Sequence, residues 1–95
     1  MMTSHERTDL IHIMKMNRLT MVDWDTARLS FKGQLKEIDY EIIILAVEIQ
    51  PTITIKNMER TIYSETVKSI DDLKIFLEER LYRILEVRLA GPLNI

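Results

Sequence analysis

The chain has 95 residues, of which 46% are hydrophobic and 29% charged, with a formal net charge of −2 at pH 7. This length predicts a single domain, residues 1–95, and the mildly acidic balance gives no overall attraction to nucleic acid or anionic lipid. The absence of cysteine excludes disulfides and thiolate zinc sites, and the isolation of the two glycines excludes phosphate-cradling loops.

The N-terminal segment, residues 9–17 (DLIHIMKMN), fits neither a helix nor a strand clearly. A helix would gather Leu10, Ile13 and Met14 on one face, and Thr3 with Glu6 would form a capping box at its start. A strand would separate the isoleucines from the methionines on opposite faces. Both readings remain open at this point.

Five segments between residues 19 and 65 have strand patterns. Residues 19–24 and 27–33 alternate and are separated by a turn at 25–26, and residues 52–56 and 61–65 flank a turn at 57–60. Between them, residues 38–49 are apolar on both alternating sets, which is typical of a central strand covered on both faces. The pattern predicts an antiparallel meander of four to five strands. The apolar run at 42–47 is far shorter than the roughly 20 residues of a membrane span, so we expect no membrane contact. The cysteine-free composition fits a cytoplasmic protein, which is the location we expect.

The C-terminal segment, residues 69–92, predicts one long helix that packs across one face of the sheet. Ser69 is a good N-cap, Asp71 and Asp72 suit the first turn, and Gly91 followed by Pro92 marks the end. At about 100° per residue, one broad apolar arc is expected to form the core face. Its members are Ile70, Leu73, Phe76, Leu77, Leu81, Ile84, Leu85 and Val87. The fold class is therefore predicted to be α+β.

A second apolar stripe, Ile75, Tyr82 and Leu89, has seven-residue spacing on the opposite side of this helix. Scattered apolar residues on a surface are common, but three in line with a tyrosine are typical of a contact surface. One helix covers only one sheet face, so the second apolar face of residues 38–49 needs either the N-terminal segment or another chain. We therefore predict a protein partner, a second copy being the commonest kind.

Arg80 interrupts the core arc of the predicted helix. We expect its stem to lie at the edge of the core with the guanidinium in water. The alternative is a buried or interfacial pair with a carboxylate, such as Glu48 or Asp39.

Residues with catalytic or metal-binding chemistry are few. His5, Asp9 and His12 would share a face only on a helix, and solvated histidines at a polar terminus explain them better than a metal site. Asp23 and Asp25 would share a face of an extended chain, but a polar turn explains them better than an acid pair. We therefore expect no enzyme activity, no metal and no cofactor.

The alternative function is nucleic-acid binding by the basic stretch 28–36. Arg28, Lys32 and Lys36 provide the charge, and Phe31 lies among them. Strand alternation, however, separates Phe31 from Arg28 and Lys32, and the net charge opposes binding. We therefore expect a small non-enzymatic interaction module, that is, a subunit, adaptor or inhibitor that associates with itself.

Overall fold

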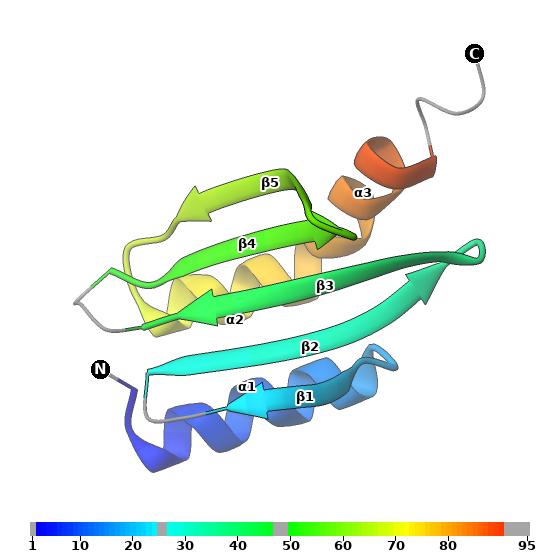
Figure 1. Cartoon of the computed structure of the whole chain (residues 1–95). Helices are drawn as coiled ribbons and strands as arrows, with labels where there is room; N and C mark the ends of the chain where they lie inside the picture. The colour runs from blue at the N-terminus through cyan, green and yellow to red at the C-terminus, as the bar shows by residue number, and fades with distance from the viewer. Residues whose placement is uncertain (1, 25–26, 47–49, 91–95) are drawn as a thin grey trace.

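The computed structural model describes residues 2–24, 27–46 and 50–90. The five strands form one antiparallel sheet in the order β1-β2-β3-β4-β5 (Figure 1). The α+β class and the antiparallel meander predicted from the sequence are confirmed. In chain order the elements are α1 (Ser4–Met16), β1 (Thr20–Trp24), β2 (Arg28–Leu35), β3 (Ile38–Leu45), β4 (Thr52–Asn57), β5 (Arg60–Thr66), α2 (Ile70–Glu79), α3 (Leu81–Leu85) and the π-helical segment η1 (Glu86–Ala90).

The N-terminal segment is helical, which decides between the two open readings. The Glu6 backbone N–H donates to Thr3 Oγ1 over 3.1 Å, and the Thr3 backbone N–H donates to Glu6 Oε1 over 2.9 Å. This reciprocal capping box satisfies two N–H groups that a helix start leaves unpaired. Leu10 and Met14, one turn apart, are both fully buried, so α1 is held by its cap and by core packing.

Both α1 and α2 lie on the same face of the sheet (Figure 1). Lys74 Nζ on α2 lies 2.9 Å from Asp9 Oδ2 on α1, which joins the two helices at their surface. Between the helices and the sheet lies one apolar core, because alternate residues of each strand point towards the helices. Its fully or almost fully buried side chains include Leu10, Met14, Leu29, Phe31, Ile42, Ile44, Ile53, Ile55, Leu73, Phe76 and Leu77.

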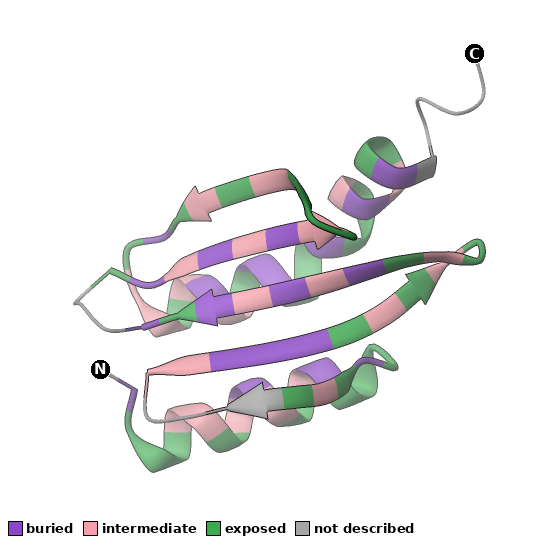
Figure 2. Cartoon of the chain, viewed as in Figure 1, coloured by how far each residue is buried: buried purple, intermediate pink, exposed green. Residues whose placement is uncertain are grey.

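β3 is the central strand, as predicted, but within the described residues only one of its faces is covered, and the N-terminal segment does not supply the second cover. Ile42 and Ile44 are fully buried beneath the helices, whereas Ile43 is half-buried and Leu45 is 40% exposed. Burial alternates in the same way along β4 (Figure 2). The reason is that α1 joins α2 in the same layer. Within the described residues, no helix covers the other face of the sheet.

The predicted single C-terminal helix is wrong, because three short helical segments, α2, α3 and η1, replace it. Its start is confirmed, since Ser69 Oγ accepts the Asp72 N–H over 3.2 Å, while the predicted stop at Gly91 and Pro92 lies outside the described residues. The interruption is at Arg80, where φ is −114° and ψ is −25°. Arg80 N–H still donates to Phe76 O, and Ile84 N–H donates to Arg80 O. The axis therefore bends at Arg80 without losing its connection (Figure 1).

Candidate interaction surface

The predicted stripe on the C-terminal helix is only partly on the surface. Ile75 and Tyr82 are 50% and 61% exposed, but Leu89 is only 5% exposed and belongs to the core. Conversely Val87, predicted in the core arc, is 57% exposed. The bend at Arg80 and the wider π-helical turn of η1 change the angle between successive residues. Seven-residue spacing therefore no longer keeps the three side chains in line, and the stripe is reduced to Ile75 and Tyr82.

Arg80 forms an ion pair that the sequence did not suggest. Its guanidinium nitrogens lie 3.1 and 3.2 Å from the two carboxylate oxygens of Glu65 on β5. The group also packs over the Phe76 ring, with 5.0 Å between the guanidinium carbon and the ring centroid. The side chain is 53% exposed, so the predicted position at the core edge is correct but the partner is neither of those considered. Asp39 Oδ1 instead accepts from Gln34 Nε2, and Glu48 lies outside the described residues.

Tyr63 completes this cluster between β5 and α2. Its hydroxyl donates to Glu65 and accepts from Arg80 Nη2 over 3.3 Å. The hydrogen bond from Tyr63, followed by that from Arg80, lowers the pKa of the Glu65 carboxyl below its usual value. Burial, followed by the hydrogen bond to Glu65, raises the pKa of the Tyr63 hydroxyl. Both shifts favour a neutral tyrosine beside an ionised carboxylate, so the cluster fastens the bend in the helix to the sheet and does not form an acid–base pair.

In the part of the chain that the structure describes, no helix covers the sheet face opposite α1 and α2 (Figure 1). We call it the open face, and the strand register places on it Thr20 of β1, which pairs with Lys32, together with alternate residues of β2 to β5. They are Arg28, Ser30, Lys32 and Gln34 of β2, Asp39, Glu41, Ile43 and Leu45 of β3, Thr52, Thr54 and Lys56 of β4, and Ser64 and Thr66 of β5.

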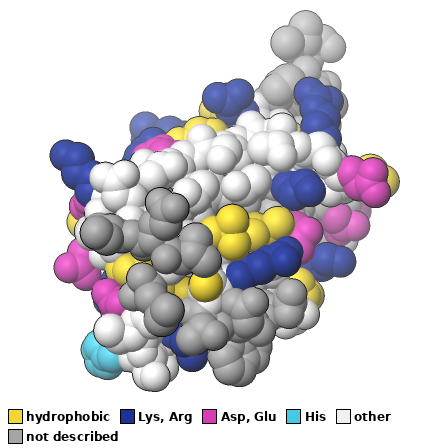
Figure 3. Space-filling view, turned by 60° about the vertical axis from the view of Figure 1, so that its left-hand side comes forward, with side chains coloured by type: hydrophobic (Ala, Val, Ile, Leu, Met, Phe, Trp, Pro, Cys, Tyr) yellow, Lys and Arg dark blue, Asp and Glu magenta, His cyan; other side chains and the backbone are white. Residues whose placement is uncertain are grey.

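The central strand, β3, carries two neighbouring apolar side chains on the open face, Ile43 and Leu45, which we call the apolar centre. Leu45 is the last residue of β3, and the positions beside the pair on β2 and β4 are polar or charged. Ile43 and Leu45 follow each other on the same side of β3, and Leu45 is among the exposed large hydrophobic residues. Hydroxyl pairs border them, with 3.3 Å between the Thr52 and Thr66 oxygens. In the space-filling view, hydrophobic side chains gather in a patch with basic and acidic side chains beside it (Figure 3). An apolar centre with a polar rim is the usual composition of a protein contact.

Ser30 is an unusual member of the open face. Its side chain is only 1% exposed, and its Oγ has no hydrogen-bond partner among the described residues. A buried hydroxyl without a partner costs about 1–3 kcal/mol. Ser30 faces Ile43 on the neighbouring strand, so the polar position lies directly beside the apolar centre.

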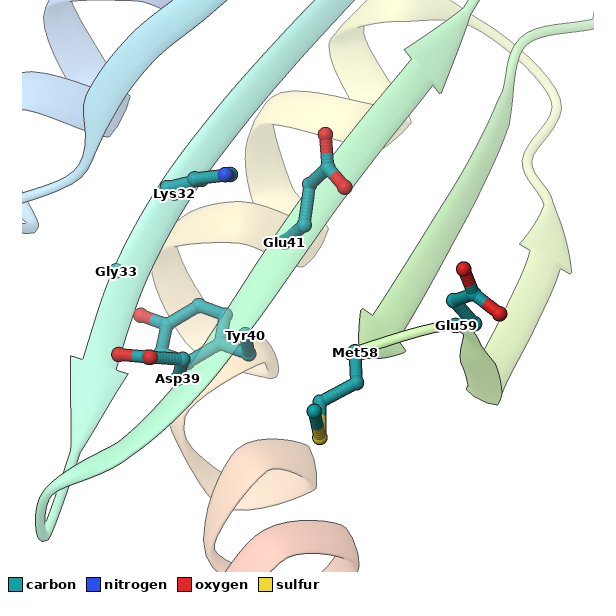
Figure 4. A pocket seen from close by; sticks show the side chains of 7 residues that line it. All are labelled: Lys32, Gly33, Asp39, Tyr40, Glu41, Met58 and Glu59. Atoms are coloured by element: carbon teal, nitrogen blue, oxygen red, sulfur yellow. The ribbon is translucent and has the colours of Figure 1, made fainter.

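A hollow of about 460 Å³ lies beside this face, near the β4–β5 turn (Figure 4). Met58 forms part of its wall and is 84% exposed, so the hollow is not an enclosed cavity. Burial raises the pKa of the Tyr40 hydroxyl, which keeps it neutral at physiological pH. Small-molecule sites bury most of the ligand surface, whereas this hollow is open and four of its seven lining residues are charged. The lining residues are Lys32, Gly33, Asp39, Tyr40, Glu41, Met58 and Glu59.

The residues of the predicted nucleic-acid alternative are divided by the fold. Arg28 and Lys32 lie on the open face, whereas Phe31 is fully buried on the helix side, as strand alternation predicted. Lys36 lies in the β2–β3 turn, where its φ is +52°. The described side chains of the open face include no aromatic ring on which a base could stack. The structure therefore provides basic residues without the stacking platform.

The candidate metal residues His5, Asp9 and His12 do share one helix, but the Asp9 carboxylate is already paired. Asp9 Oδ2 is 3.6 Å from His5 Nε2 and 2.9 Å from Lys74 Nζ, and the hydrogen bond from Lys74 lowers the pKa of Asp9. Throughout the described ranges, no group of three or more possible ligands is close enough to hold a metal ion. Asp23 pairs with Ser30 in the sheet register, but its side chain is not described, and Asp25 lies outside the described residues.

Two further observations concern the whole described chain. None of its helices has both the length and the apolar character needed to cross a membrane. Comparisons of the chain with protein-family models, with curated proteins and with solved structures find no match.

Proposed function

We propose that this protein is a small, non-enzymatic interaction module that associates with a second copy of itself through the open face. The observation that carries the proposal is the apolar centre at Ile43 and Leu45 on a sheet face that no described helix covers. Antiparallel sheets commonly have one solvated face, but that face is then polar. Apolar residues at its centre are better explained by a second layer.

The size of the face sets the expected strength of association. Four strands about 4.8 Å apart, in contact over about six residues of about 3.4 Å each, give a flat area of about 400 Å² per copy. The two copies together bury twice this area, which is still below the roughly 1,200 Å² of total buried surface where standard interfaces begin. We expect a reversible dimer with a dissociation constant of about 10 to 500 µM.

Sedimentation velocity and light scattering over a concentration series that spans this range would test the proposal. The wild-type mass should rise towards twice that of the monomer. Leu45→Glu should remain monomeric, because it places a charge in the apolar centre, and it should stay folded, because Leu45 is 40% exposed. A wild type that remains monomeric throughout the series would refute the proposal.

Tyr82→Glu is the matched control on the remainder of the helix stripe. Tyr82 is 61% exposed, so this variant should also fold. Under the proposal it dimerises like the wild type. If Tyr82→Glu abolishes the dimer and Leu45→Glu does not, the contact lies on the C-terminal helix around Ile75 and Tyr82, and the open face is not the interface.

A further inference from the structure

A row of alternating charge crosses the three middle strands of the open face. Lys32 on β2 pairs in register with Glu41 on β3, and Glu41 pairs with Lys56 on β4. Since adjacent strands are about 4.8 Å apart, the row is positive, negative and positive over about 10 Å. Ile43 follows Glu41 on the same side of β3, so the row borders the apolar centre directly.

The three charges of this row are not used in ion pairs within the described part of the chain. The ion pairs found there lie at the helix surfaces and beside β5, and they join Asp9 to His5 and Lys74, Lys74 to Asp71, and Glu65 to Arg80. A partner that covers the apolar centre would bring its own groups against this row. It must therefore present the opposite charges at the spacing of two adjacent strands, and a reversed copy of the same row does so.

We infer that a second copy packs face to face on the open face, with Glu41 of each copy against Lys56 of the other. This inference rests on the proposed function and specifies its contact. A two-fold axis parallel to the strands, midway between β3 and β4, brings β3 of one copy over β4 of the other. Because a two-fold contact is made twice, the dimer contains two Glu41–Lys56 pairs.

The same axis satisfies the apolar centre. It places Ile43 over Thr54 and Leu45 over Thr52 of the second copy, so each large apolar side chain faces a threonine methyl group. Packed sheets lie about 10 Å apart and within about 30° of parallel, which lysine and glutamate side chains can span. The neighbouring axis, between β2 and β3, would instead place Leu45 over the charged Arg28 and Ile43 over the buried Ser30. The axis between β3 and β4 is therefore the better fit.

Charge exchange between two separate variants tests this contact. Glu41→Lys and Lys56→Glu should each weaken self-association about tenfold to a hundredfold, because two attractive contacts per dimer become repulsive. An equimolar mixture of the two variants should restore a dimer of wild-type strength, measured by sedimentation velocity with one variant fluorescently labelled. Lys32→Glu is the matched control, since this axis places Lys32 away from both pairs, and it should dimerise normally.

The mixture separates a contact between copies from a contact within one chain. Glu41 and Lys56 are also neighbours in the same sheet, so either variant weakens an attraction inside its own chain. Mixing cannot repair that internal loss. If circular dichroism shows both variants folded but the mixture does not dimerise, this contact is wrong. A dimer lost in Lys32→Glu but not in Lys56→Glu would place the axis between β2 and β3 and would also refute it.

The proposed function and this contact fail in different ways. If the wild type never associates, both the proposed function and this contact are refuted. If the wild type dimerises and the dimer is lost in Leu45→Glu but not in Glu41→Lys or Lys56→Glu, the proposed function is supported and this contact is refuted. If Glu41→Lys instead tightens binding to single-stranded DNA and leaves no protein dimer, the open face is a nucleic-acid surface and both proposals are refuted.

Discussion

Gly33 is the position where a single added methyl group should have the clearest effect on stability. A Cβ atom built at Gly33 would lie 2.8 Å from Tyr40 Oη, 2.9 Å from Tyr40 Cζ and 2.9 Å from Leu19 Cδ2. Tyr40 pairs with Gly33 across β2 and β3 and is only 7% exposed, so its ring has little room to move. Glycine at this position is therefore required by the packing of the tyrosine ring against the strand.

Two opposing effects determine how much Gly33→Ala changes the free energy of unfolding. Replacing glycine in a strand gains roughly 0.5–1 kcal/mol by reducing the freedom of the unfolded chain. Overpacking a core typically costs about 1–3 kcal/mol. Since contacts below 3.0 Å must be relieved by moving a buried ring, we expect a net loss of about 1–2 kcal/mol, measured by urea denaturation followed by circular dichroism.

A double variant identifies the cause of this loss. Tyr40→Leu removes the ring and creates space, so adding Gly33→Ala to it should cost less than in the wild type, or should stabilise it. The difference between the two costs is the coupling between the sites, as in any double-mutant cycle. If Gly33→Ala alone stabilises the protein, or costs the same with and without Tyr40, the ring does not explain the glycine.

Four further predictions test the core, the open face and the cluster on β5. Leu77→Ala should lower the free energy of unfolding by about 2–5 kcal/mol, because Leu77 is 2% exposed and its loss leaves a cavity; a loss below about 1 kcal/mol in denaturant titration would contradict this. Ser30→Ala should be neutral or stabilising by up to about 1 kcal/mol, because it removes a buried hydroxyl that has no partner among the described residues, and a clear loss in the same titration would show that the hydroxyl has one. Because the folded-state pKa of Glu65 is lowered from 4.5, its ionised form should add stability above about pH 4.5 that is lost as the pH falls further; Glu65→Gln should therefore be less stable than the wild type at neutral pH, and the two denaturation midpoints should converge in acid. Binding to mixed single-stranded RNA or DNA at physiological salt should be weak by fluorescence anisotropy, and submicromolar binding that weakens in Arg28→Glu or Lys32→Glu would favour the nucleic-acid alternative.

Local patterns in the sequence determined most of the secondary structure. Strand alternation separated Phe31 from Arg28 and Lys32, and the structure has Phe31 fully buried on the helix side. The Ser69 N-cap and the Thr3–Glu6 capping box are short-range interactions, so their residues are visible in sequence. The same is true of the turn between β4 and β5, which lies between two runs of alternating residues, whereas the turn predicted at 25–26 lies outside the described residues.

The helix bend at Arg80 was not predictable from local pattern, because the contacts that Arg80 makes at the bend are distant in sequence. Arg80 is 15 residues from Glu65, and neither glycine nor proline marks the break. The apolar periodicity continues through Arg80 in the sequence and therefore predicted one continuous helix. That helix would have Val87 in the core and Leu89 on the surface. In the folded chain, η1 packs so that Leu89 lies in the core.

The sequence by itself determined that β3 carries apolar residues on both faces, from which we expected a covering layer on each face. It did not determine which layer α1 would supply, because the face covered by a helix depends on its crossing from Met16 to Thr20 and on contacts such as Lys74 to Asp9. Those contacts exist only in the folded chain. Tertiary structure places α1 beside α2, leaves Ile43 and Leu45 without a covering helix in the described residues, and so decides where a second copy is expected to bind.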